Sequence, residues 1–204
     1  MTTTPPADPK PPLDTPPTEL AAPPSAPPEP MESPPATAPP LDLAPTALTG
    51  EQHRRVAIAL FNRAWDLLAL TERSPELDDE LLHTAHASRL HWTAAGGDAT
   101  RLATGEWQCA RVYAVLGRAE PAEWHAGRAL AICRAATITG FLEGAAYEAL
   151  ARAALVAGDA EAARRWAEQA RAIAEGLDDE EDREVLTADL DDLDTRLATT
   201  DGAG

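Results

Sequence analysis

The sequence predicts an all-α protein of about seven antiparallel helices, stacked as helical hairpins after a Pro-rich N-terminal tail. Two observations support this fold class. From Leu48 onward, apolar side chains recur at helical spacing between Gly and Pro residues, and no segment alternates as a β-strand does. In addition, one helix-turn-helix unit repeats itself after 41 residues.

Residues 1–47 form the predicted tail. Seventeen of the 19 prolines lie between Pro5 and Pro45. Because proline donates no backbone hydrogen bond and this stretch has little apolar surface to bury, we expect an extended, disordered spacer. Recognition of the tail by a Pro-binding domain is a less favoured alternative, since Lys10 is its only basic residue.

The predicted folded domain spans residues 48–199, and residues 200–204 are expected to be a disordered C-terminus. Its predicted helices are, in chain order, 50–72, 75–95, 99–116, 121–139, 141–157, 160–175 and 178–198. The last is an acidic capping helix that should cover the end of the stack. Its apolar stripe is Val185, Leu186, Leu190, Leu193 and Leu197.

Short capping motifs mark where the first three helices begin. Thr49 and Gln52 have the spacing of a capping box before the first helix. Ser74 followed by Pro75 places a capping side chain and a first-turn proline at the start of the second helix. Asp98 is the predicted cap of the third helix.

Glycine and proline separate the later helices. Gly117 should end the third helix, and Pro121 suits the first turn of the fourth. We expect Gly140 to end the fourth helix, Gly158 to form the turn between the fifth and sixth, and Gly176 to end the sixth. Together with the capping motifs, these residues set the predicted helix boundaries.

The charge distribution bears on the partners of the protein. The net charge is −17, from 34 acidic and 17 basic residues. The acidic excess lies at the two ends, because residues 46–174 are nearly neutral, with 14 Arg and 16 acidic residues. Proteins that bind nucleic acid present clustered positive charge, so we expect no nucleic acid partner.

The sequence also bears on compartment. No run of 18 apolar residues is present, so no membrane-spanning helix is expected. The N-terminus shows no basic patch followed by an apolar run. Cys109 and Cys133 are too few for a disulfide framework, and both fall at apolar helical positions. We therefore expect a cytoplasmic protein with two reduced, buried thiols.

The repeat becomes visible when Ala110–Ala122 is laid over Ala151–Ala163. In both copies, small residues stand where two antiparallel helices would cross closely. At these positions the sequence resembles the tetratricopeptide repeat family. The residues that carry the resemblance are Ala110, Tyr113, Gly117, Ala122 and Ala129 in the earlier unit, and Tyr147, Leu150, Ala151, Gly158, Ala163 and Ala170 in the later one.

This resemblance implies stacked helical hairpins that present a groove to a partner. Glu106 departs from the family pattern, because it stands at an aromatic position, and the 41-residue period exceeds the usual period of about 34. Residues 86–92 and 105–126 are also similar to an uncharacterised family of small bacterial helical-repeat proteins. That similarity implies no particular activity.

One group of polar residues has the composition of a site. His83, His86 and His91 fall on the second predicted helix within an arc of about 140°. Glu106 on the third helix and His125 on the fourth could converge with them, which would suit metal binding or proton transfer. A structural polar layer inside the helical stack is the favoured interpretation, because no His-Glu-x-x-His motif is present.

The favoured functional hypothesis is a non-catalytic protein-protein interaction module, an adaptor or scaffold that binds a peptide or partner helix in a helical-repeat groove. The candidate binding residues are His86, Arg89, His91, Glu106, Arg111, His125 and Arg152. The alternative is a small metal- or ligand-binding enzyme or sensor built on His83, His86, His91, Glu106 and His125. No phosphate-binding Gly loop, Gly-x-Ser-x-Gly elbow or Cys-x-x-Cys pair is present, so we expect no cofactor and assign no catalytic residue.

Overall fold

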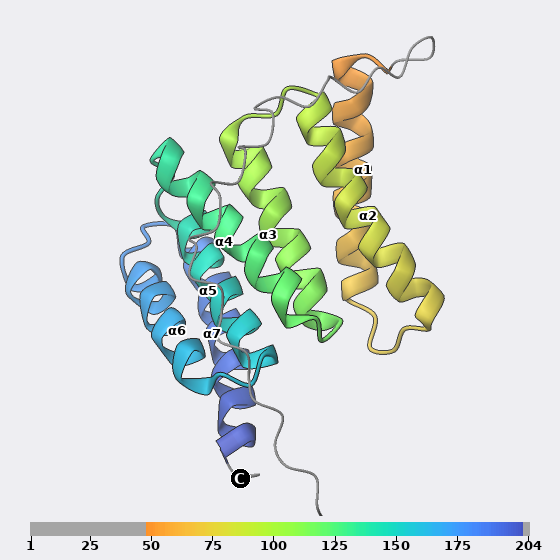
Figure 1. The fold of residues 1–204 in the computed structure, drawn as a ribbon. Helices are drawn as coiled ribbons and strands as arrows, with labels where there is room; N and C mark the ends of the chain where they lie inside the picture. The colour runs from red at the N-terminus through yellow and green to blue at the C-terminus, as the bar shows by residue number, and fades with distance from the viewer. Residues whose placement is uncertain (1–47, 202–204) are drawn as a thin grey trace, which may run out of the picture. The chain divides into compact units, whose positions relative to one another are not determined.

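The computed structural model describes residues 48–201, and in this part of the chain every regular element is an α-helix (Figure 1). The helices are α1 (Gly50–Leu68), α2 (Pro75–Ala94), α3 (Ala99–Val115), α4 (Ala119–Ala136), α5 (Phe141–Val156), α6 (Ala160–Glu175) and α7 (Glu180–Asp201). The predicted all-α fold class is thus confirmed. The predicted tail 1–47 and residues 202–204 lie outside the described residues.

The helices form three successive hairpins and a final helix. α1 pairs with α2, α3 with α4, and α5 with α6, and each hairpin packs beside the next (Figure 1). α7 packs against α5 and α6. This packing of neighbouring helices fits a helical repeat, as the sequence predicts.

Alanine side chains fill the helix crossings inside the second and third hairpins. These alanines are at most 4% exposed: Ala122, Ala126, Ala129, Ala163, Ala167 and Ala170. They are three pairs of positions 41 residues apart, so both copies of the repeat use the same packing. A methyl group at a crossing allows the helix axes to approach to about 8 Å, the short end of the usual range.

Most predicted caps form in the structure. Thr49 Oγ1 accepts a hydrogen bond from the backbone N–H of Gln52, and Gln52 Oε1 accepts one from the backbone N–H of Thr49. Asp98 accepts a hydrogen bond from the backbone N–H of Arg101 at 2.9 Å. Ser74 occupies the N-cap position of α2, but its side chain makes no capping hydrogen bond. The predicted position of Ser74 at the start of the helix is therefore confirmed, whereas the capping hydrogen bond expected from its side chain is absent.

Two helices end earlier than predicted. α1 ends at Leu68 with Ala69 as its C-cap, and residues 70–74 form the connection to α2, which begins at Pro75. α4 ends at Ala136, because Thr137 takes a left-handed conformation with φ of 55°. Gly140 does not end α4. It lies at the N-cap of α5 with φ of 82°.

α7 covers the open side of the third hairpin. Four leucines of its predicted stripe are at most 4% exposed: Leu186, Leu190, Leu193 and Leu197. Val185, which was predicted in the same stripe, is 47% exposed and faces solvent. On α5, a Cβ atom at Gly144 would lie 2.5 Å from Cδ2 of Leu186, so a glycine at this position allows α7 to approach.

The last helix is longer than predicted. It continues to Asp201, so residues 200 and 201, predicted to be disordered, are helical. Its sequence contains neither Gly nor Pro before Gly202, and nothing in the chain interrupts the helical pattern earlier. Within residues 48–201, no helix combines the length and apolar composition that a membrane span requires.

Candidate functional site

The carboxylate of Glu106 on α3 is the centre of a buried polar cluster and is 3% exposed. Its Oε1 accepts hydrogen bonds from Nε of Arg89 at 3.0 Å and from Nε of Arg128 at 3.2 Å. Its Oε2 accepts one from Nδ1 of His125 at 2.7 Å. Arg89 belongs to α2, whereas His125 and Arg128 belong to α4. One carboxylate therefore connects three helices, and we call this group the Glu106 cluster.

The local sequence explains how Arg89 reaches this carboxylate. Glu106 follows Gly105, and a Cβ atom at Gly105 would lie 2.6 Å from Cδ of Arg89. The missing side chain lets the stem of Arg89 lie against the backbone of α3. Arg89 also donates from Nη1 to Oγ1 of Thr93 at 2.5 Å, which fixes the guanidinium on α2.

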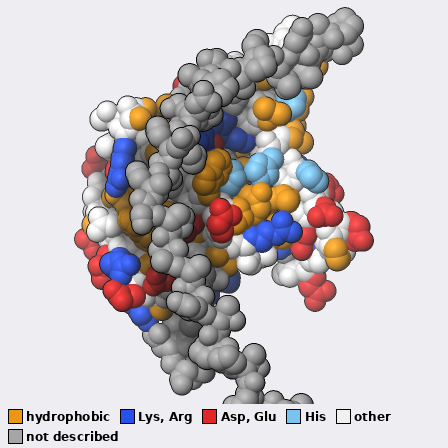
Figure 2. Space-filling view, viewed as in Figure 1, with side chains coloured by type: hydrophobic (Ala, Val, Ile, Leu, Met, Phe, Trp, Pro, Cys, Tyr) orange, Lys and Arg blue, Asp and Glu red, His pale blue; other side chains and the backbone are white. Residues whose placement is uncertain are grey.

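Aromatic rings surround the Glu106 cluster. His86 Nε2 lies 2.9 Å from the hydroxyl of Tyr113, and the His86 and His125 ring centroids are 5.2 Å apart. The ring of His125 stacks on Tyr113 and meets the edge of Trp124. Figure 2 shows histidine side chains gathered over α2 on the face turned toward the viewer. The structure thus brings together four of the predicted binding residues, namely His86, Arg89, Glu106 and His125.

The neighbouring charges keep Glu106 ionised. Burial alone raises the pKa of this carboxyl, but the hydrogen bond from His125 and the charges of Arg89 and Arg128 outweigh it, so the pKa lies below its usual value. Burial and the nearby His125 lower the pKa of His86, which favours its neutral form. At neutral pH the cluster combines a carboxylate anion with a neutral His86.

The nearby groups with nucleophilic atoms stay protonated. Burial raises the pKa of Tyr113, and burial together with the charge of Glu106 raises the pKa of Cys109 to about 12. A nucleophile needs a lowered pKa or an adjacent free base. Both oxygens of Glu106 already accept hydrogen bonds, so this geometry suits a polar layer that joins helices better than it suits catalysis.

Two predicted histidines lie outside this cluster. His91 pairs with His53 of α1, with their Nδ1 atoms 2.9 Å apart. His83 makes no hydrogen bond to the cluster, although its charge contributes to lowering the pKa of His86. Among the described residues, no three His, Cys, Asp or Glu side chains are arranged as a group that could hold a metal ion.

A second buried polar cluster is centred on Glu148 of α5, which is 1% exposed. Glu148 Oε1 accepts hydrogen bonds from Nε of Arg152 at 2.7 Å and from Nη1 of Arg111 at 3.3 Å. Burial raises the pKa of Glu148, although the charges of Arg152 and Arg111 act to lower it. Arg111 and Arg152 occupy equivalent positions of the 41-residue repeat. These two predicted binding residues therefore meet at one carboxylate, on neighbouring helices.

Two acidic residues of α7 complete the Glu148 cluster. Arg111 Nη2 donates to Asp189 at 2.5 Å, and Arg152 Nη1 donates to Asp192 at 2.7 Å. Asp189 and Asp192 are three residues apart, so they share one face of α7 and meet arginines from α3 and α5. The cluster thus attaches the capping helix to α3 and α5 by ion pairs.

Aromatic side chains lie between α1 and α3, which contact each other only sparingly. The ring centroids of Trp65 and Trp107 are 5.4 Å apart, and Phe61 lies 6.2 Å from Trp65. This row of aromatic rings continues onto α5, where the ring centroid of Phe141 lies 6.2 Å from that of Trp107. We call the region the α1–α3 seam, and its residues are Ile58, Phe61, Trp65, Leu68, Arg101, Thr104, Trp107, Arg111 and Val115.

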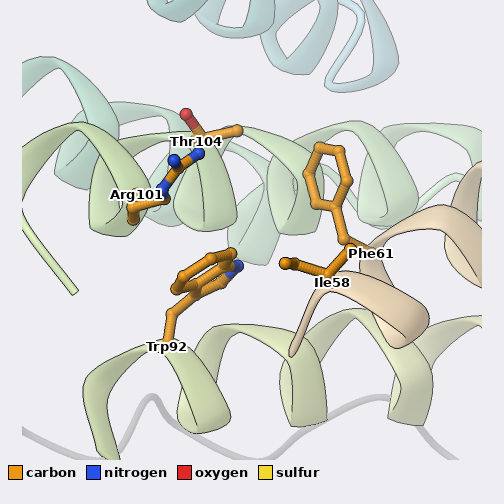
Figure 3. Close-up of a pocket in the computed structure, with 5 residues that line it drawn as sticks. All are labelled: Ile58, Phe61, Trp92, Arg101 and Thr104. Atoms are coloured by element: carbon orange, nitrogen blue, oxygen red, sulfur yellow. The ribbon is translucent and has the colours of Figure 1, made fainter. Parts of the chain in front are cut away.

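A pocket opens at each end of the α1–α3 seam. The N-terminal pocket has a volume of about 290 Å³ and is lined by Ile58, Phe61, Trp92, Arg101 and Thr104. Figure 3 shows these side chains, from α1, α2 and α3, pointing toward a common space. The guanidinium carbon of Arg101 lies 5.0 Å from the centre of the Trp92 ring.

The C-terminal pocket of the seam has a volume of about 280 Å³. Trp65 and Leu68 of α1 line it together with Val115 of α3. Its charged lining consists of Arg111, Arg152, Asp192 and Arg196. The Glu148 cluster therefore borders this pocket. Of the predicted binding residues, Arg111 and Arg152 line a pocket, whereas Arg89 and Glu106 belong to the other cluster.

Sequence reasoning missed several residues of these regions. Glu148, Asp189 and Asp192 were not among the candidates, although the 41-residue repeat already paired Arg111 with Arg152. Arg111 and Arg152 stand at equivalent positions of the repeat and are flanked by apolar residues. This pattern could have predicted that both arginines are buried and pair with carboxylates. Neither Trp92 nor Arg101 carried such a signal, because a Trp and an Arg at helical spacing occur in any packed helical protein.

The fold and these sites define a helical-repeat protein with two buried polar clusters and an aromatic seam between its first two hairpins. No protein-family model, no curated protein and no solved structure matches this chain. Its function is therefore inferred from the geometry of the described residues.

Proposed function

We propose that this chain is a non-catalytic partner-binding module, in which a peptide or helix of another protein lies along the α1–α3 seam. The observation that carries this proposal is an aromatic seam with an arginine-bearing pocket at each end. From Ile58 to Leu68, the seam runs for about 15 Å, since a helix rises about 1.5 Å per residue. This length suits about four residues of an extended peptide.

The composition of the seam supports binding. Trp and Arg are the residue types that most often dominate binding energy at protein interfaces, and the seam contains both. Ile58 is 36% exposed and Val115 is 44% exposed, so each end of the seam offers apolar surface to a partner. A partner that covered these side chains would remove apolar area from water, which is favourable.

The alternative of a small enzyme or sensor built on the Glu106 cluster has weaker support. Both carboxylate oxygens of Glu106 already accept hydrogen bonds, from Arg89, Arg128 and His125, and these groups lower its pKa. A general base works best when its pKa lies near the working pH, so these contacts make Glu106 a weak base. We therefore assign the Glu106 cluster a structural role and place the binding function at the seam.

We place the module in the cytoplasm. Cys109 and Cys133 are both free and buried in the described fold. Free thiols persist in the reducing compartments of the cell, where disulfides are rare. This part of the proposal concerns the working environment of the protein and is independent of the identity of its partner.

Two valines offer a matched test of the proposed site. Val115 lies at the C-terminal pocket of the seam, and Val185 lies on α7 outside the seam, with exposures of 44% and 47%. The full chain and the variants Val115→Asp and Val185→Asp would be purified from the native cells at native levels, and bound proteins identified by mass spectrometry. We expect a specific partner with the wild-type chain and with Val185→Asp, and its loss with Val115→Asp.

Both variants should fold, because each adds a charge to an already exposed position. Circular dichroism of the purified variants checks this. Retention of the partner by Val115→Asp, or its equal loss from Val185→Asp, would contradict binding at the seam.

A further inference from the structure

The N-terminal pocket of the α1–α3 seam has the size of one large side chain. Its volume of about 290 Å³ lies just below the range of about 300–1,000 Å³ for small-molecule sites. Ile58, Phe61 and Trp92 provide apolar walls, as Figure 3 shows. Shape and lining therefore favour a bulky apolar side chain of a peptide over a larger cofactor.

Arg101, which lines this pocket, and Arg54 of α1 form no ion pair within the part of the chain that the structure describes. Arg101 stacks over the ring of Trp92, and a guanidinium stacked on an indole keeps its in-plane N–H donors available to a carboxylate. Arg54 stands one helical turn before Ile58, on the same face of α1. The chain has 34 acidic residues, and none of the described ones neutralises either arginine.

We propose that this pocket selects an acidic-apolar segment of the partner. A bulky apolar side chain occupies the pocket, and a neighbouring carboxylate of the same segment pairs with Arg101 and Arg54. This inference rests on the proposed function and adds the chemistry of the partner. A basic segment does not fit, because it would place its cations against both arginines without a carboxylate to separate them.

The overall charge of the protein makes this selectivity easy to recognise. With a net charge of −17, long-range electrostatics attract basic peptides and repel acidic ones. A preference for an acidic peptide therefore reports a local contact with the arginines. A preference for a basic peptide is what non-specific attraction would give.

Three labelled peptides of equal length provide the test. Each carries the same central Leu-Phe pair, and the flanking residues are Asp and Glu in the first, Gln in the second and Lys in the third. Binding to the full chain is measured by fluorescence anisotropy at fixed ionic strength. We expect the acidic peptide to bind at least about tenfold more tightly than the neutral one, and the basic peptide to bind most weakly.

Charge reversal at the pocket identifies the residues responsible. Arg101→Glu should remove the preference for the acidic peptide. Arg165→Glu makes the same change of charge on α6, where the side chain of Arg165 is 59% exposed and pairs with Glu161. This control should leave the preference within about twofold of the wild-type chain, because an exposed pair contributes little. Replacement of Leu-Phe by Ser-Ser in the acidic peptide should abolish its binding.

The outcomes separate this inference from the proposed function. If all three peptides bind equally and Val115→Asp weakens them all, the seam binds peptides and the charge selectivity is wrong. If none binds at about 1 mM, or if Arg101→Glu retains the preference, the inference is overturned. Recovery of a native partner that depends on Val115 decides the proposed function independently.

Discussion

At the residue scale, the two copies of the repeat place different residue types at one pair of equivalent positions. Glu106 and His125 form a hydrogen bond of 2.7 Å, whereas 41 residues later Tyr147 and Trp166 place their ring centroids 5.9 Å apart. A buried ion pair gains little net stability over a packed apolar pair, but removal of one partner is costly. The Glu106 cluster therefore restricts which helices pair, and its loss should be strongly destabilising.

We expect Glu106→Gln to lower the free energy of unfolding by about 3 kcal/mol, because it leaves the largely buried Arg89 without its counter-charge. Urea denaturation followed by circular dichroism measures the change. Glu161→Gln is the control, since Glu161 pairs with Arg165 at the surface and its loss should cost less than about 0.5 kcal/mol. Equal, small effects of the two substitutions would show that the cluster is not a structural ion pair.

The histidines should make stability depend on pH. Burial lowers the pKa of His86 and of His91 below the usual value of 6.5, so the folded chain binds fewer protons than the unfolded chain as the pH falls below 6.5. This stability is complete above 6.5 and is lost as the pH falls from 6.5 through the lowered pKa values of the folded chain. We expect the melting temperature to drop by about 2–5 °C between pH 7.5 and 5.5.

A variant separates this effect from general acid unfolding. His91→Gln removes the contact with His53 and one of the shifted groups, so its melting temperature should fall less over the same range. The carboxyl pKa of Glu106 is lowered from 4.5, so that group acts only at more acidic pH. An identical pH profile for His91→Gln and the wild-type chain would refute a contribution from the His53–His91 pair.

At the scale of the helices, short sequence motifs predicted where helices begin better than where they end. The capping box of Thr49 depends on residues three positions apart, so the sequence alone specifies it. The end of α4 depends instead on Thr137, whose left-handed conformation carries no sequence signal comparable to a glycine. The exposure of Val185 likewise follows from where α5 and α6 meet α7, which periodicity alone does not determine.

Two helical glycines test the contact that seats α7. A Cβ atom at Gly144 would lie 2.5 Å from Cδ2 of Leu186 and 3.2 Å from Cγ2 of Ile173, whereas one at Gly127 would meet nothing within 4 Å. We expect Gly144→Ala to lower the free energy of unfolding by about 1–3 kcal/mol. Gly127→Ala should raise it by about 0.5–1 kcal/mol, because alanine favours the helix.

Thermal and urea unfolding of both glycine variants provides the measurement. The two substitutions add the same methyl group to a helix, so their difference isolates the approach of α7. Stabilisation by Gly144→Ala would mean that α7 does not pack closely on α5.

At the scale of the whole folded part, the charge is divided between surface and interior. The acidic C-terminal segment provides Asp189 and Asp192, which pair with Arg111 and Arg152. Part of the negative charge of this segment, which is expected at the surface from the sequence, therefore neutralises arginines inside the repeat. The sequence showed both sets of charges, but only the packing of α7 on α5 and α6 brings Asp189 and Asp192 within reach of the two arginines.

The α1–α3 seam is likewise a property of the assembled helices. Phe61, Trp65 and Trp107 look like core residues in the sequence, because aromatic residues at helical spacing usually are. Phe61 and Trp65 line pockets because α1 and α3 contact each other sparingly, whereas Trp107 is a buried core residue as the sequence suggests. Arg111 and Arg152, which are predicted from the sequence as binding residues, line the C-terminal pocket, whereas nothing in the sequence separated Arg101 from an ordinary surface arginine.

Hydrogen–deuterium exchange of the full chain, with and without its recovered partner, tests the central claim most directly. Binding along the seam should slow exchange in α1 and α3 and leave α6 unchanged, because a bound segment suppresses local opening where it makes contact. Protection confined to α6 and α7, with α1 and α3 unchanged, would contradict a binding site at the α1–α3 seam.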